Sequence, residues 1–436
     1  MSQEDLLFAY VFTAPAVSIA AGIAIFFAEA ASIMPAKMIA VAAKASAFVF
    51  AMLACRQCHE SLEPVSRSFV WIETPSGSLE LFFNADSSCL DIVLFLSIIS
   101  LCAFAFYMSE AKFADRISSG RILALSCINE GCIYAALLSG TLLQSGLLFM
   151  ASSVAAYLLL LSRCASSGDA ERINLMVLSG IAADYMIIAG AAMLSEPSGI
   201  SLNYPMIAIL GTASPAFGLI MAGCAIKSGM FPFCFIFFAQ KENDFKYAAK
   251  SLVLGNIVSS VYIICLLCPL APSIPSLYRF LFEFAAALAC IFFGIAVFKR
   301  RNIFMQGCLI AFFIASSASC SILDSQQPEP ILFSAVSSAS AVILFPHALS
   351  IRTYDESIDD INYKESPIFS SVYIFLMLSA SCLPPFSGFA RNASLCQIPL
   401  GLNGVLFSCS FFIMAFACMR RIRSVLAIWR LNIYSK

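Results

Sequence analysis

Long apolar segments recur along this sequence, and they constrain its fold more than any other feature. Hydropathy separates about thirteen such segments. Each is roughly 18–25 residues long, the length that an α-helix needs to cross a bilayer. Only 12% of the residues are charged, whereas soluble domains carry roughly 25%. The predicted fold class is therefore all-α: a polytopic membrane protein with about 13 transmembrane helices (roughly 12–14).

The predicted spans run from one end of the chain to the other. They cover residues 6–28, 39–55, 90–108, 122–143, 145–161, 173–194, 216–238, 252–269, 277–298, 303–323, 331–351, 368–389 and 400–418. The longest polar stretch, residues 56–88, follows the second span. Within it, runs at residues 68–72 and 78–82 flank Pro75-Ser76-Gly77, which predicts a small β-hairpin.

The distribution of Lys and Arg predicts the orientation of the chain. With the N-terminus outside, the inner loops and the C-terminal tail hold 19 of these residues and the outer segments hold 4. Such an excess is the positive-inside signal of membrane proteins. We therefore expect an integral protein of a bacterial inner (cell) membrane, with its N-terminus outside and its C-terminus cytoplasmic. The net charge of −1 offers no basis for nucleic-acid binding.

Lys227 is the only charged residue in the apolar segment 216–238. A charge at the bilayer centre costs about 2.5–3.5 kcal/mol on insertion scales, so it marks a functional site by default. The alternative is a lysine that extends to the membrane surface. Gly229 and Pro232, followed by Phe233, interrupt the helix here. Membranes tolerate such a break only where protein or water satisfies the freed backbone groups, so we expect a polar cavity around this amine.

Four further ionisable residues are candidates for a proton or ion relay. Glu130 and Asp184 lie inside spans, and each is either a relay group or a structural carboxylate that is neutral or paired. His347 and Arg391 lie beside other predicted helix breaks, one at Pro346 and one at Pro384-Pro385 and Gly388. For a lone histidine the structural interpretation is favoured. Groups of this kind, linked by water, can pass protons.

One cofactor motif occurs in the sequence, and we do not expect it to function. Cys55, Cys58 and His59 match the C-x-x-C-H pattern of covalent haem attachment. The polar stretch behind it is too short to wrap a haem, and a zinc site built on these residues lacks a clear fourth ligand. There is also no phosphate-binding loop. We therefore predict no cofactor, no metal and no catalytic centre within this chain.

Two proline-phenylalanine motifs carry a resemblance to a known family. Residues 225–233 resemble the K-S-x-x-x-P-F-H segment of the antiporter-like subunits of respiratory complex I (NADH:quinone oxidoreductase) and of Mrp-type cation/proton antiporters. Residues 383–389 resemble the family's L-P-P-F-x-G-F segment. The resemblance covers about residues 86–389 in register and implies inverted helical repeats with broken helices.

This resemblance also implies a division of the chain. Residues 1–85 would hold the first two helices and the outside hairpin. Residues 86–391 would form the antiporter-like transmembrane core. Residues 392–436 would form the last helix and a basic cytoplasmic tail.

The function implied by the family is proton or cation translocation within a respiratory-chain or Mrp-like assembly. Such a subunit has no redox centre and works with other membrane subunits, so the chain would at most be a non-redox part of an NADH dehydrogenase-type enzyme. Lys227 matches the family's central lysine. Uncharged residues stand at or near other expected relay positions: Met150 for a glutamate, Cys234 for a histidine, Val258, Ser340 and Asn392. Two alternatives therefore stay open, a transport-inactive structural paralogue and an independent secondary transporter.

Overall fold

The computed structural model describes residues 3–28, 33–61, 65–74, 77–109, 116–161, 167–195, 215–238, 248–300, 303–325, 327–350, 367–380 and 402–434. The chain divides into two compact units by the packing of its backbone. Unit 1 comprises Met1–Cys224 and Pro269–Pro275, and unit 2 comprises Ala225–Cys268 and Ser276–Lys436. The motif-based division of the chain rests on a different criterion and stays a prediction.

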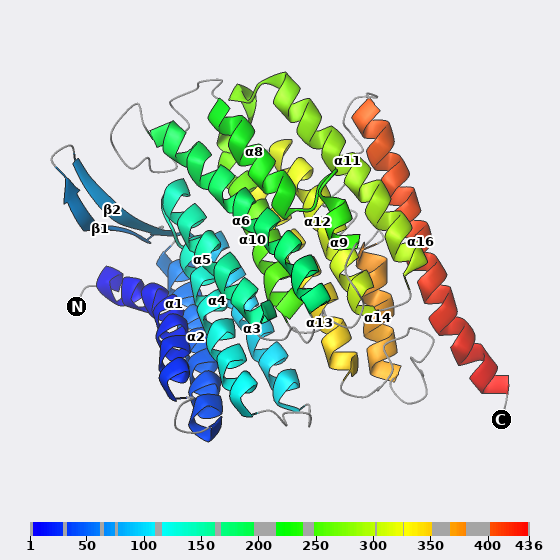
Figure 1. The fold of residues 1–436 in the computed structure, drawn as a ribbon, viewed down its shortest axis with the longest axis horizontal. Coiled ribbons are helices and arrows are strands. Elements are labelled where there is room, and N and C mark those ends of the chain that lie inside the picture. Colours follow the sequence, from blue (N-terminus) through cyan, green and yellow to red (C-terminus); the bar gives the residue numbers. More distant parts are fainter. Residues whose placement is uncertain are drawn as a thin grey trace. The chain divides into compact units, whose positions relative to one another are not determined.

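Unit 1 is a bundle of helices. They are α1 (Gln3–Ala28), α2 (Ile33–Ser61), α3 (Ser87–Ser109), α4 (Arg116–Leu137), α5 (Leu142–Leu161), α6 (Ser167–Ser195) and most of α8 (Pro215–Lys227). α1 packs against α2 and α4, α2 against α3, α4 against α5, and α5 against α6 (Figure 1). This order brings polar residues from five consecutive helices, α2 to α6, into the interior of one bundle.

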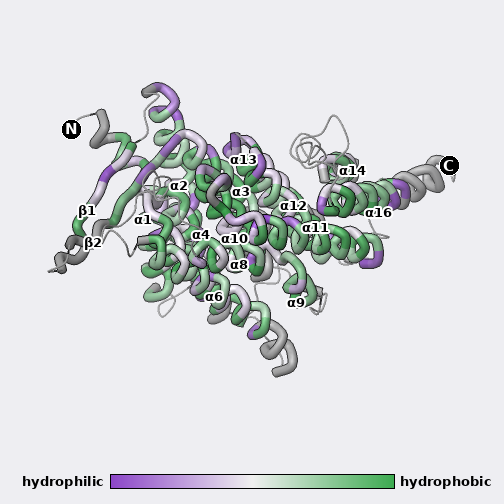
Figure 2. The backbone as a smooth tube through the Cα atoms, turned by 90° about the horizontal axis from the view of Figure 1, so that it is seen from above, coloured by the Kyte–Doolittle hydropathy of each residue, from purple (hydrophilic) through white to green (hydrophobic). Residues whose placement is uncertain are grey.

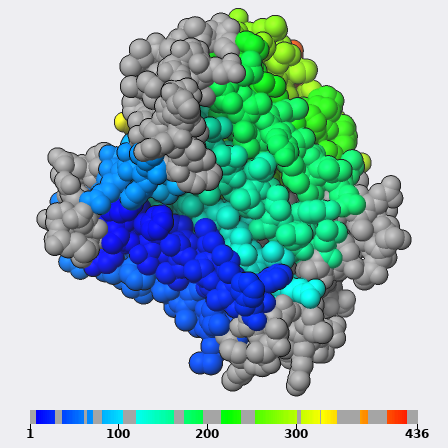
Figure 3. Space-filling view, turned by 60° about the vertical axis from the view of Figure 1, so that its left-hand side comes forward, coloured from blue at the N-terminus to red at the C-terminus, as the bar shows by residue number. Residues whose placement is uncertain are grey.

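Small residues allow the helices α1 and α4 to approach closely. A Cβ atom added to Gly22 would lie 2.5 Å from Ile128 Cγ1, and one added to Gly131 would lie 2.6 Å from Ile19 Cγ1. Within a bilayer, helices associate through such close van der Waals packing because lipid supplies no hydrophobic driving force between them. Figure 3 shows the dark-blue surface of α1 directly beside the cyan helices of the same unit.

The predicted hairpin is confirmed. β1 (Val65–Thr74) and β2 (Gly77–Ala85) pair in antiparallel register, with an irregularity between Val70 and Ile72. Gly140, between α4 and α5, donates its N–H to the carbonyl of Phe82 on β2 at 2.7 Å. The hairpin is thereby tied to the helices of unit 1. Figure 2 shows hydrophilic residues on the hairpin and at helix ends, whereas most of the helical tube is hydrophobic.

Unit 2 is built around one buried helix. Its helices are α9 (Cys234–Phe238), α10 (Ala248–Leu267), α11 (Ser276–Lys299), α12 (Ile303–Leu323), α13 (Pro328–Ser350), α14 (Pro367–Ala380) and α16 (Leu402–Tyr434). A short 3₁₀ helix, Cys268–Ser273, follows α10. α12 packs against α10, α11 and α13, and every residue of its apolar segment is buried.

The all-α membrane fold class is confirmed. Among the described residues, nine helices are long and apolar enough to cross a membrane, and two shorter apolar helices occur at Pro215–Lys227 and Pro328–Leu344. The chain is an integral membrane protein. The number of about thirteen spans stays a prediction, because part of the chain between these helices lies outside the described residues.

The C-terminal helix is longer than predicted. The last span was expected to end at Cys418, whereas α16 continues to Tyr434. No Gly or Pro interrupts this extension, so the backbone has no local reason to leave the helix. Arg421 also anchors it, since its guanidinium donates to the carbonyls of Val297 (3.4 Å), Phe298 (3.2 Å) and Arg300. These are carbonyls at the end of α11, which have no partner within their own helix.

Candidate functional site

A helix break places Lys227 at the end of α8. The N–H of Gly229 donates to the carbonyl of Ile226 (3.1 Å) and that of Met230 to the carbonyl of Ala225 (2.8 Å). This is the Schellman pattern that closes helix C-termini. It needs a left-handed residue after the helix, and Gly229 has φ 69°. Pro232 and Phe233 follow before α9 begins at Cys234.

The protein satisfies polar backbone groups that the break exposes. Ser316 on α12 donates its hydroxyl to the carbonyl of Ser228 at 3.0 Å. The N–H of Phe231 donates to the carbonyl of Ala285 on α11 at 3.2 Å. The rings of Phe231 and Phe235 also pack on Phe292, with centroids 5.9 and 5.3 Å away. Unit 2 therefore supplies the protein contacts that a broken helix requires inside a membrane.

Lys227 is one of the largest fully buried side chains in the described residues, with 1% exposure. Its Nζ donates to the hydroxyl of Ser259 on α10 at 3.1 Å. It lies in the last turn of α8, the end of a helix where basic residues are commonly found. The amine thus lies in the interior of unit 2 and not at an exposed surface. The cavity that we expected around it stays a prediction.

Unit 2 contains several fully buried serines, and the sequence analysis did not single them out as a group. They are Ser259 and Ser260 on α10, Ser316, Ser317, Ser319 and Ser321 on α12, and Ser340 on α13, each with 0% exposure. Several donate to carbonyls three or four residues earlier in their own helix, as serines in helices often do. Two of the serines make contacts beyond their own helix. Ser259 accepts from the side chain of Lys227, and Ser316 donates to the backbone at the helix break. The serine-rich run within span 303–323 was the sequence signal that could have predicted this group of buried serines.

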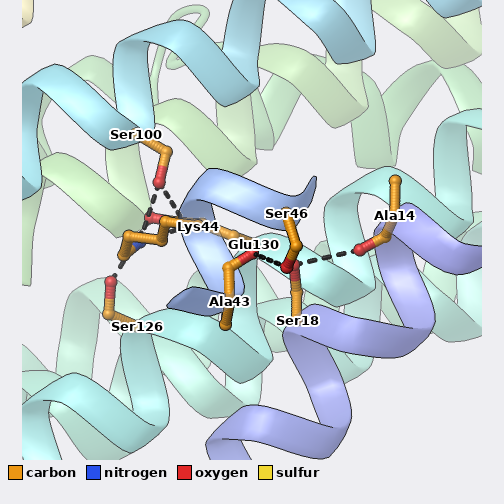
Figure 4. Close-up of polar contacts among 8 residues, drawn as sticks. All are labelled: Ala14, Ser18, Ala43, Lys44, Ser46, Ser100, Ser126 and Glu130. Atoms are coloured by element: carbon orange, nitrogen blue, oxygen red, sulfur yellow. Dashed lines mark hydrogen bonds and ion pairs between the residues drawn. The ribbon is translucent and has the colours of Figure 1, made fainter. Parts of the chain in front are cut away.

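A second buried lysine lies in unit 1, where Lys44 on α2 forms an ion pair with Glu130 on α4. The two side chains are 5% and 19% exposed. Lys44 also donates to Ser100 on α3 at 2.7 Å, while the Glu130 carboxylate accepts from Ser100 and, at 3.3 Å, from Ser126 (Figure 4). Of the two alternatives that the sequence left open for Glu130, a relay group or a structural carboxylate, its ion pair with Lys44 fits the second. The sequence analysis did not identify Lys44 as its partner, although a lysine within span 39–55 was a signal.

Asp184 on α6 lies in the interior of the same unit, with 0% exposure. It accepts a hydrogen bond from the hydroxyl of Ser153 on α5 at 2.7 Å. The neighbouring Ser152 donates to Asn129 on α4, also at 2.7 Å. Ser153 lies three residues after Met150, so the α5–α6 polar contact is about one helical turn from the position where the motif resemblance predicts a glutamate.

These contacts form three separate polar groups inside unit 1. The first joins Lys44, Ser100 and Glu130 on α2, α3 and α4. The second joins Ser152 on α5 to Asn129 on α4, and the third joins Ser153 on α5 to Asp184 on α6. Each pair of neighbouring helices from α2 to α6 therefore has a polar contact between its members.

The remaining predicted site residues are not placed. His347 belongs to α13, but its side chain is outside the described part of the structure. Arg391, Pro384, Pro385 and Gly388 lie outside the described residues altogether. Their predicted roles stay predictions.

A third charged group joins three helices of unit 2. Arg279 pairs with Glu283 at 3.1 Å, as the i,i+4 spacing predicts, and also with Asp324 after α12. Asn403 on α16 donates to Glu283 at 3.1 Å. This arrangement links α11, α12 and α16, which fits a structural role.

The sequence matches no protein-family model and no curated protein. Many solved structures, however, have similar folds, and chains of three complexes are among them. A chain of the membrane-bound sulfane sulfur reductase, an archaeal respiratory membrane complex, has 13% identity and a TM-score of 0.78, with 97% of this chain and 88% of that chain covered. A chain of respiratory complex I from Thermus thermophilus has 16% identity and a TM-score of 0.77, with 95% and 88% covered.

A chain of the Mrp complex from a Dietzia species has 16% identity and a TM-score of 0.74, with 98% of this chain and 80% of that chain covered. All three likenesses extend over nearly the whole chain, whereas the two motifs occupy only short segments of it. At these identities they establish the fold. The resemblance indicated by the motifs is thus confirmed at that level, and the chain has the fold of the antiporter-like membrane subunits found in complex I and Mrp complexes.

Proposed function

We propose that this chain is a proton- or cation-translocating membrane subunit of a complex I-like or Mrp-like assembly, with Lys227 as its central relay residue. The observation that carries the proposal is a lysine with 1% exposure, hydrogen-bonded to a hydroxyl at a break in a helix. A charge held inside a membrane protein at such a cost marks an ion pathway more often than a structural contact. The shared fold supports the same assignment.

The chemistry of this site is proton exchange at an amine. Lys227 donates to Ser259, and a hydroxyl both accepts and donates hydrogen bonds. Ser259 can therefore accept from the ammonium and pass on a hydrogen bond, here to the carbonyl of Asn256 at 3.0 Å. A proton or cation that moves past the amine would alter the charge or the hydrogen bonding of Lys227. This step requires no redox group in this chain.

In unit 1 we assign Asp184 as a further relay group and Glu130 as a structural residue. Asp184 accepts from a serine hydroxyl, that of Ser153, and Lys227 donates to a serine hydroxyl, that of Ser259, so each charged group contacts a hydroxyl that can both donate and accept. Glu130 instead shares an ion pair with Lys44, which neutralises both charges. Arg391 and His347 are proposed as relay groups on the basis of the sequence alone.

The proposed partners are other membrane subunits. The similar chains come from multi-subunit respiratory or Mrp complexes, and electron transfer, where it occurs, would belong to those partners. The lipid bilayer and protons or monovalent cations complete the list. We place the chain in a bacterial inner membrane by its likeness to such assemblies, and the distribution of Lys and Arg favours an N-terminus outside.

A structural subunit without transport is the second candidate. It is favoured by the uncharged residues at the aligned positions Met150, Val258 and Ser340. Val258 and Ser340 have 1% and 0% exposure, so neither contributes a charge to the interior. An independent secondary transporter is a third possibility, but no contact among the described residues favours it.

Ion flux in vesicles that contain the whole assembly tests the proposal. We expect Lys227→Ala to lower proton or cation flux by about tenfold or more, which corresponds to about 1.4 kcal/mol. Lys299→Ala is the matched control, because Lys299 is an exposed lysine at the end of α11 and its loss should leave flux unchanged. Unchanged flux in Lys227→Ala would refute the relay and support the structural alternative. Transport by the isolated chain alone would support the independent transporter.

A further inference from the structure

The end of α2 and the start of α3 bring three metal-ligating side chains together in unit 1. Cys55 Sγ donates to Asp91 Oδ1 at 2.9 Å, and His59 Nε2 lies 3.2 Å from the same oxygen. One ligand atom from each residue lies within 4.8 Å of the others. We propose that Cys55, His59 and Asp91 form a binding site for a borderline transition-metal cation, Zn²⁺ foremost.

The donor set points to this class of ion. Thiolate, imidazole and carboxylate bind Zn²⁺ at about 2.0–2.3 Å, so ligand atoms in a tetrahedral site lie roughly 3–4 Å apart. Two of the observed distances are 2.9 and 3.2 Å, and the third is at most 4.8 Å, which is close to that spacing. A sulfur and a nitrogen ligand disfavour Mg²⁺ and Ca²⁺, which prefer oxygen. On binding, the Cys55 thiol loses its proton to solvent and a sulfur–zinc bond forms, so the metal does not change its oxidation state.

The backbone holds the three residues in place before any ion arrives. Cys55 and His59 are spaced i,i+4 on α2, so they share one helix face. Asp91 comes from the neighbouring helix α3, which packs on α2 (Figure 1). Lys44 lies three turns before Cys55 on the same face of α2, and its contact with Ser100 fixes the same helix pair farther along. The ligands therefore project from two helices whose packing is already determined.

Access to the site is one-sided. Cys55 is buried, whereas the side chains of His59 and Asp91 are 53% and 39% exposed. An ion can therefore enter from solvent, and a water molecule can occupy the fourth position. A coordinated ion would join the two helices that flank the β1–β2 hairpin.

The sequence alone suggested a different set of ligands. It placed Cys55, Cys58 and His59 together as a haem-like motif and found no fourth ligand for zinc. The structure adds Asp91, 32 residues after His59 in the chain. Cys58 is not among the atoms that lie within 4.8 Å of one another in this group. The site is thus a link between two helices and not a short linear motif.

Metal binding to the purified full-length chain tests the site. We expect one Zn²⁺ per chain by calorimetry, and a sulfur-to-cobalt absorption band when Co²⁺ replaces it. Cys55→Ser should abolish that band, and Asp91→Asn and His59→Gln should each weaken binding by about tenfold or more. Cys102→Ser is the matched control, because Cys102 is an exposed thiol on α3, and it should bind normally.

Each outcome decides the question. Absence of Zn²⁺ binding to the folded wild type at micromolar metal would overturn the proposal, as would equal affinity in Cys55→Ser. Gel filtration checks that each variant is folded. If Cys55→Ser proves to be unfolded, the affinities of Asp91→Asn and His59→Gln, which keep the thiol, test the proposal instead. None of these measurements depends on ion transport, so the site can stand or fall separately from the proposed function.

Discussion

Two buried lysines, one in each unit, have different environments. Lys44 in unit 1 forms an ion pair with a carboxylate that also accepts from two serines. Lys227 in unit 2 lies at the end of the broken helix α8 and donates to the hydroxyl of Ser259 on α10. A carboxylate compensates the charge of an amine, whereas a hydroxyl accepts a hydrogen bond from the amine and carries no opposite charge. Burial of a lysine therefore does not by itself identify a relay, and the chemistry of its partner matters as much.

The largest expected effect concerns the ion pair in unit 1. Removal of one partner by Glu130→Ala leaves Lys44 buried without this carboxylate, and should lower the free energy of unfolding by about 3–5 kcal/mol. The double variant Lys44→Met/Glu130→Leu should recover most of that loss. Denaturation in detergent measures both.

The control for this experiment is an exposed ion pair on α2. Arg56 and Glu60 are 78% and 59% exposed, so Glu60→Gln should cost less than about 1 kcal/mol. If Glu130→Ala lowered the free energy of unfolding no more than Glu60→Gln does, the proposed structural role of the buried pair would be refuted.

A smaller effect is expected at the helix break that positions Lys227. Gly229→Ala forces a side chain into the left-handed conformation, at a cost of about 1–2 kcal/mol. We expect reduced stability and reduced ion flux together, because the end of α8 would shift. Gly229→Asn should be milder, since Asn tolerates this conformation. Equal effects of the two substitutions would show that backbone conformation is not what matters at this residue.

The smallest effect separates two neighbouring serines on α10. Ser259→Ala removes the hydrogen bond to Lys227 and should cost about 0.5–1.5 kcal/mol, with a measurable loss of flux. Ser260→Ala is the matched control, because Ser260 donates only within its own helix among the described contacts, to the carbonyl of Ile257. A loss of flux in Ser260→Ala as large as that in Ser259→Ala would argue against a specific role of the Ser259 hydroxyl.

Local signals allowed the sequence to predict much of the fold. Hydropathy identified the helices, turn residues identified the hairpin, and Gly229 with Pro232 identified the helix break. The continuation of α16 past its apolar segment was not predicted, because hydropathy marks only the apolar part of a helix. Arg421 anchors this extension through contacts about 120 residues away in sequence.

Partners in the candidate sites were harder to predict. Lys44 and Glu130 are 86 residues apart, and Lys227 and Ser259 are 32 residues apart. No local pattern specifies which helices of a bundle become neighbours. The presence of each buried charge could be predicted from sequence, but its partner, and therefore its role, required the packing of the helices.

The most direct test compares ion flux for the two lysines in the same vesicle assay, with each variant assembled and folded. The account predicts that Lys227→Ala loses flux by about tenfold or more with little change in stability, and that the double variant Lys44→Met/Glu130→Leu keeps wild-type flux. Normal flux in Lys227→Ala, combined with loss of flux in the double variant, would contradict the account and place the relay in unit 1.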